Sequence, residues 1–145
     1  MNKPDRVLRE IARRVMKTRP LAAPTAAAAA EAMELSCGDL YRILETVMGR
    51  DGLQALIGRA IQITAREYPW LATVQSGTSA DCPVSGLAEA AGRLGVAEAS
   101  EGYAALLASI IWLLMTFIGE DLTLRFVRHA WPNVSLSKLS EDSST

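Results

Sequence analysis

Residues 102–119, GYAALLASIIWLLMTFIG, decide how this chain folds, because all eighteen of them are uncharged. A membrane-spanning helix needs about 20 predominantly apolar residues, so the segment lies at the lower limit of that length. A helix that is apolar on all sides is also typical of the buried centre of a helical protein. The segment is therefore either a core helix or a membrane span, and its flanks have to distinguish the two.

The flanks favour a protein core. Glu101 precedes the segment and Glu120 and Asp121 follow it, at positions where a membrane span usually has basic or aromatic anchors. Further downstream, apolar residues continue at helical spacing as far as Trp131. Such an amphipathic extension needs a protein surface to pack on, so we expect a hydrophobic central helix over about residues 103–118.

A single membrane span over residues 102–119 remains the alternative. Twelve of the fifteen Lys and Arg residues precede the segment, which would keep a basic N-terminal half at the cytoplasmic surface. Small residues inside the segment allow close packing against another helix in water or in lipid. Ala105 and Ser109, together with the large Trp112, are therefore candidates for a helix–helix interface.

The rest of the chain shows helical periodicity and no convincing strand alternation. A basic amphipathic helix is expected over about residues 4–17, and an exposed loop rich in Ser, Gly and Thr over residues 75–84. Further helices are predicted over residues 26–35, 37–48, 51–68 and 86–94. The expected fold is all-α: a single-domain bundle of five or six helices within residues 1–134, followed by a flexible polar tail over residues 135–145.

Local signals mark the ends of these helices. Thr25 is a suitable N-cap for the Ala-rich helix. Ser36 and Asp39 have the spacing of a capping box, which predicts a new helix start at this point. Gly49 is a typical C-terminal stop. We therefore expect three separate helices between Thr25 and the break at Pro69.

Composition excludes several classes of protein. The chain has 145 residues, of which 50% are hydrophobic, and its 15 basic and 16 acidic residues give a formal net charge of −1. It is too apolar for a disordered protein and too close to neutral for a dedicated nucleic-acid binder, so no nucleic-acid partner is expected. No secretory signal is recognised, which predicts a cytoplasmic protein, with the inner membrane as the alternative location.

Few residues suggest chemistry. The single histidine, His129, lies near the predicted end of a helix, where its electrostatics are favourable without any catalytic role. Cys37 falls in the first turn of a predicted helix, where the helix dipole could lower its pKa; a small core residue is the other interpretation. Both are weak functional candidates, and we expect no catalytic residue, metal or cofactor.

We therefore predict a small non-catalytic interaction or regulatory module that self-associates, with a homodimer as the simplest form. Its candidate interface residues are Trp112, Ala105, Ser109 and Trp131. One alternative is a single-span membrane protein, with contact through residues 102–119 or through the basic N-terminal helix. The other is a small ligand-binding or enzymatic helical protein.

Overall fold

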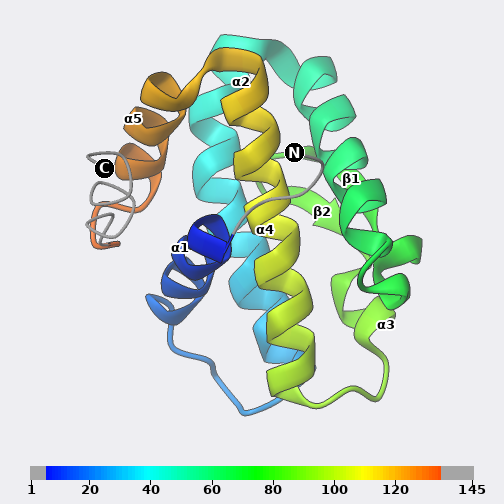
Figure 1. The fold of residues 1–145 in the computed structure, drawn as a ribbon. Coiled ribbons are helices and arrows are strands. Elements are labelled where there is room, and N and C mark those ends of the chain that lie inside the picture. The colour runs from blue at the N-terminus through cyan, green and yellow to red at the C-terminus, as the bar shows by residue number, and fades with distance from the viewer. Residues whose placement is uncertain (1–5, 135–145) are drawn as a thin grey trace.

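The computed structural model describes residues 6–134, which are mostly helical with a small hairpin (Figure 1). The elements follow one another along the chain as α1 (Arg6–Lys17), α2 (Ala26–Ala65), a 3-10 helix (Pro69–Thr73), β1 (Gln75–Ser79), β2 (Cys82–Ser85), α3 (Leu87–Ala91), α4 (Val96–Ile118) and α5 (Glu120–Ala130). The predicted tail over residues 135–145 lies outside the described residues.

Helix α1 forms because its apolar residues recur at helical spacing and can be buried on one side. Leu8, Ile11 and Val15 are all buried, and α1 packs mainly against α4. The helix ends at Lys17, and the hydroxyl of the next residue, Thr18, donates a 2.7 Å hydrogen bond to the carbonyl of Val15. Residues 6–17 thus form an amphipathic helix whose apolar side is buried.

Helix α2 begins as the sequence predicts but continues further. The hydroxyl of Thr25 accepts a 3.1 Å hydrogen bond from the amide of Ala28, as expected for an N-cap. The helix break predicted at the capping-box pattern is wrong, because Ser36 lies inside α2 and its hydroxyl has no hydrogen-bond partner among the described residues. The real break is at Gly49, whose φ of +80° favours glycine and bends the helix.

Tertiary packing explains why the helix continues through Ser36. Gly38 lies directly against the hairpin, since a Cβ at this position would be 2.5 Å from the carbonyl oxygen of Ala80. Asp39, which a capping box would use locally, instead forms a salt bridge with Arg19 from the loop after α1. These long-range contacts outweigh a weak local start signal.

The loop predicted over residues 75–84 is instead an antiparallel hairpin of β1 and β2, in which Ser76 pairs with Val84. Both strands pack on α2, and Val84 is fully buried there. Gly77 permits this pairing, because any side chain there would overlap the backbone of Cys82. Such short strands carry too few residues to show an alternating pattern, so the prediction of a loop was wrong here, whereas the mostly helical fold is confirmed.

Helix α4 runs alongside α2 and is also contacted by α1 and α5 (Figure 1). Every residue from 102 to 111 is buried. The helix stops at Gly119, whose φ of +90° turns the chain into α5, so the two segments that the sequence joined are separate helices. Within the described chain, α4 alone is long and apolar enough to cross a membrane, and 67% of its most apolar window is buried inside the fold.

Candidate functional site

The described residues hold no group of three or more His, Cys, Asp or Glu side chains placed to bind a metal ion. Cys37 is not the activated thiol that its predicted place in a first turn implied. It lies in the interior of α2, and burial raises its pKa to about 12, with a smaller contribution from Glu34. Cys37 is therefore a neutral core residue at neutral pH.

His129 and Trp131 both lie at the end of α5 but have different surroundings. His129 is exposed in the last turn, the position that the sequence predicts. Trp131 is buried, and its ring nitrogen donates a 3.1 Å hydrogen bond to the carbonyl of Ser36. This bond holds the end of α5 on α2, so Trp131 serves contacts within the chain and offers little surface to a partner.

The small residues of α4 are also occupied inside the fold. Ala105 and Ser109 are both buried. The hydroxyl of Ser109 donates to the carbonyl of Ala105 at 3.0 Å and lies 2.9 Å from the hydroxyl of Thr64 on α2. The close helix packing that the sequence predicts is therefore the contact between α2 and α4 of one chain, and Trp112 is the candidate of the four that reaches the surface.

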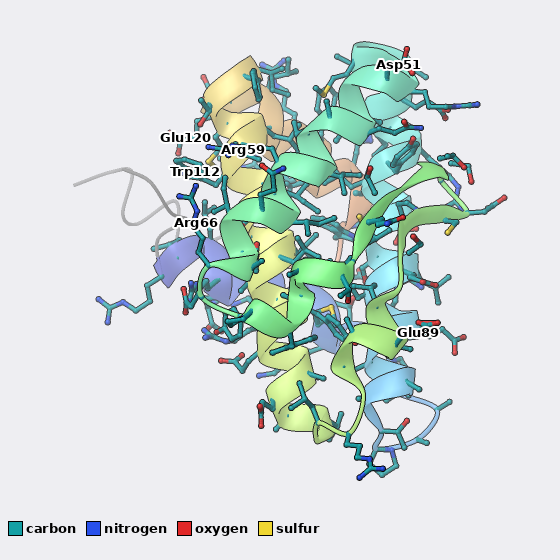
Figure 2. All side chains as sticks on the ribbon, turned by 90° about the vertical axis from the view of Figure 1, so that its right-hand side faces the viewer. Asp51, Arg59, Arg66, Glu89, Trp112 and Glu120 are labelled. Atoms are coloured by element: carbon teal, nitrogen blue, oxygen red, sulfur yellow. The ribbon has the colours of Figure 1, made fainter. Side chains whose placement is uncertain are left out.

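Trp112 lies half-buried in a surface that we name the Trp112 face: Trp112, Arg59, Arg66 and Glu120. Figure 2 shows Glu120, Trp112 and Arg66 one below another along the same edge of the molecule, with Arg59 beside them. Within the part of the chain that the structure describes, the one hydrogen bond of Arg59 is a 3.4 Å contact with the neighbouring Gln62. Arg66 and Glu120 are exposed and form no salt bridge among residues 6–134. The face thus has Trp112 at its centre and Arg66 at one end, and at the other end Glu120 lies with Arg59 next to it in the view of Figure 2.

Sequence reasoning found the aromatic centre of this face and missed its charges. Arg59 and Arg66 lie seven residues apart and therefore on the same side of the second part of α2. The sequence shows that spacing. It does not show that this side of α2 adjoins the exposed side of α4, which depends on the bend at Gly49.

The bend of α2 and the turn from α4 into α5 lie at the same end of the molecule (Figure 1), and three exposed apolar residues are close to them in the sequence. Val47, Phe117 and Leu122 are 50%, 67% and 36% exposed there. Single exposed apolar side chains are common on soluble proteins, and no charged pattern accompanies these three. Phe117 is therefore a suitable control for an exposed aromatic residue outside the Trp112 face.

The basic residues of α1 are largely paired within the fold. Arg9 forms a salt bridge with Glu67, and Arg13 forms two hydrogen bonds of 2.9 and 3.0 Å with Glu101. The apolar side of α1 is at the same time buried against α4. The membrane-contact alternative for this helix would therefore need it to leave its place in the fold.

A cavity of about 540 Å³ lies between the end of α1, the loop after it and the N-terminal half of α4. Arg13, Lys17 and Arg19 line it together with apolar side chains such as Met16 and Leu21. This cavity was not predicted from the sequence. The available signal was Leu21, an apolar residue held in a loop between two prolines.

No protein-family model, curated protein or solved structure matches this chain.

Proposed function

We propose that the chain is a small non-catalytic helical interaction module that forms a homodimer through the Trp112 face. In this proposal each protomer is a helical bundle built around α4. The observation that carries the proposal is the order of Glu120, Trp112 and Arg66 along one edge of the molecule (Figure 2). This order makes the face complementary to a second copy of itself.

The complementarity follows from two-fold symmetry. In such a dimer the same surface is used by both protomers, so a residue near the axis meets its own copy. With the axis near Trp112, the two indole rings stack at the centre. Glu120 of each protomer then lies opposite Arg66 of the other, which pairs opposite charges at both ends.

The energetic expectation is that Trp112 supplies most of the affinity. Tryptophan is enriched among residues whose truncation costs about 2 kcal/mol or more at an interface, which corresponds to roughly a 30-fold weaker dimer. Exposed charge pairs at the rim add little affinity but select the orientation. Catalysis is not part of the proposal, since Cys37 is buried and neutral.

A cytoplasmic location belongs to the proposal, and the membrane alternative is separated from it by one test. Helix α4 reaches a mean hydropathy of 1.7 over its most apolar window. If this helix spans a membrane, the purified chain needs detergent to remain dispersed. If α4 is the core of a folded protomer, the chain is a discrete species in plain buffer.

The experiment is sedimentation velocity over a range of protein concentrations, in buffer and in mild detergent. We expect a monomer–dimer equilibrium in buffer for the unmodified chain, shifted strongly to monomer by Trp112→Ala. Phe117→Ala is the matched control, because Phe117 is an exposed aromatic residue of the same helix outside the Trp112 face. Circular dichroism verifies that each variant remains folded.

Charge exchange tests the orientation of the dimer. Arg66→Glu and Glu120→Arg each place like charges opposite one another and weaken the dimer, whereas the double variant restores it. A chain that is monomeric at all concentrations overturns the proposal. So does a dimer that survives Trp112→Ala, or a chain that is dispersed only in detergent.

A further inference from the structure

The cavity beside α1 is held open by contacts on two sides. Arg19, in the loop after α1, forms a salt bridge with Asp39, and this contact attaches the loop to α2. Arg13 forms a salt bridge with Glu101, and this contact attaches the C-terminal part of α1 to α4. Pro20 further restricts the backbone between these two anchors. The cavity is therefore part of the folded structure rather than a gap that a loop can close freely.

The walls of the cavity are mainly apolar. Met16 and Ala104 are buried at its base, and Pro20 and Leu21 form the loop side. Leu21 remains 39% exposed, so part of its apolar surface is in contact with water. Cavities of about 300–1,000 Å³ with apolar walls and a few placed polar groups are the usual form of small-molecule sites.

The rim of the cavity is positively charged. Three cations, Arg13, Lys17 and Arg19, line it, against the single carboxylate of Glu101. Arg13 holds the pKa of Glu101 below its ordinary value, so this carboxylate is ionised at pH 7. Glu101 offsets the charge of Arg13 and Asp39 offsets that of Arg19, so Lys17 supplies the remaining positive charge of the lining. Both arginines are engaged in salt bridges, whereas Lys17 forms none among residues 6–134. The ammonium group of Lys17 can therefore form a salt bridge with an added anion.

We propose that this cavity binds a small organic anion of the medium-chain carboxylate class. The carboxylate head lies at the ammonium group of Lys17, and the hydrocarbon tail lies against Met16 and Leu21. The apolar walls favour a tail, which a compact inorganic anion lacks. The excess positive charge favours a charged head, which a neutral alcohol lacks. This site is independent of the proposed homodimer, because none of its lining residues belongs to the Trp112 face.

The experiment is a titration of the isotope-labelled full chain followed by amide NMR shifts. Decanoate, kept below its micelle concentration, is the probe; 1-decanol and inorganic phosphate are the comparison ligands. We expect saturable binding of decanoate with a Kd of about 2 mM, the value that an ordinary ligand efficiency gives for a molecule of this size. The shifted amides should lie in α1, the following loop and the N-terminal half of α4.

Two variants separate the tail from the head. Ala97→Trp fills the cavity from an exposed position on α4 and is expected to abolish binding without unfolding the chain. Lys17→Gln removes the head contact and is expected to weaken binding about five- to tenfold. Arg93→Gln, which removes an exposed cation away from the cavity, should leave the Kd unchanged.

Each contrary result overturns the proposal. Decanol binding as tightly as decanoate would mean an apolar cavity without anion selection, and phosphate binding as tightly would mean a simple anion site. Decanoate that does not saturate, or that binds both variants with an unchanged Kd, would remove the site altogether.

Discussion

The apolar part of α4, residues 102–118, consists of a first half (102–111) and a second half (112–118) that have a similar composition and different surroundings. Residues 102–111 are all buried, because α1 and α2 pack over this half of the helix. Residues 112–118 include the half-buried Trp112 and the 67% exposed Phe117. Hydropathy alone would place both halves in one environment. The difference shows that burial along a helix is set by its neighbours, and that an apolar stretch can be core at one end and surface at the other.

The largest expected effect in this comparison comes from truncating one residue in each half. Leu106 is fully buried, so Leu106→Ala removes packed methyl groups and leaves a cavity, at a cost of about 2–5 kcal/mol in the free energy of unfolding. Phe117→Ala should change that free energy by no more than about 0.5 kcal/mol. Urea unfolding of the two variants measures both values. Equal losses would mean that Phe117 is covered in solution, and the comparison would fail.

Two glycine-to-alanine substitutions are expected to have smaller effects on the free energy of unfolding, one destabilising and the other stabilising. A Cβ at Gly102 would lie 2.3 Å from the Trp70 ring, which packs edge-on to Tyr103, so Gly102→Ala should destabilise the fold by about 1 kcal/mol. Gly58 in α2 has no atom within 4 Å of such a Cβ, and Gly58→Ala should stabilise by about 0.5–1 kcal/mol. Thermal unfolding compares the two. A stabilised Gly102→Ala variant would show that the Trp70 contact is loose.

The smallest expected effect on stability comes from removing the salt bridge between Arg13 and Glu101, at the start of the buried segment 102–111. The Arg13 hydrogen bonds lower the pKa of Glu101 in the folded chain. Its contribution is therefore present above the ordinary carboxyl pKa and is lost as the pH falls through the lowered value. Because both groups are partly exposed, Glu101→Gln should cost about 0.2–1 kcal/mol at pH 7 and almost nothing near pH 2.

Urea unfolding at the two pH values measures this difference. Glu31→Gln, which removes an exposed carboxylate with no salt bridge among residues 6–134, is the control. A loss for Glu101→Gln that is the same at both pH values would mean that packing, and not charge, is the source of the effect.

Local signals explain why part of the fold could be predicted from the sequence. Thr25 caps a helix because its hydroxyl accepts a hydrogen bond from an amide three residues later. Gly49 bends α2 because glycine adopts a positive φ at little energetic cost. The apolar spacing in residues 7–16 likewise identifies the buried side of α1. Such features depend on residues within one or two turns of each other.

The errors arose where distant residues outweigh local preference. The start signal at Ser36 is overridden by the contact of Gly38 with Ala80 and by the pairing of Asp39 with Arg19. The hairpin over residues 75–85 exists because α2 supports it, and its own sequence shows little strand preference. The reactive-thiol interpretation of Cys37 depended on the same misplaced helix start, whereas its alternative interpretation as a small core residue agrees with its burial.

For the candidate site, the sequence identified single residues and the structure decided which surface each one belongs to. Trp112 and Trp131 have the same side chain, although Trp112 lies in an apolar run and Trp131 stands between Ala130 and Pro132. One reaches the surface, and the other hydrogen-bonds to Ser36 inside the fold. The cavity beside α1 was not predictable, since its lining comes from segments about 80 residues apart.

The sequence by itself determined that this chain is largely helical and that α4 is its most apolar element, because helical periodicity and hydropathy are properties of neighbouring residues. Only the tertiary structure decided which half of α4 is covered, which cations are paired and where a cavity remains. These features depend on how helices far apart in the chain pack together, and no local pattern records that packing.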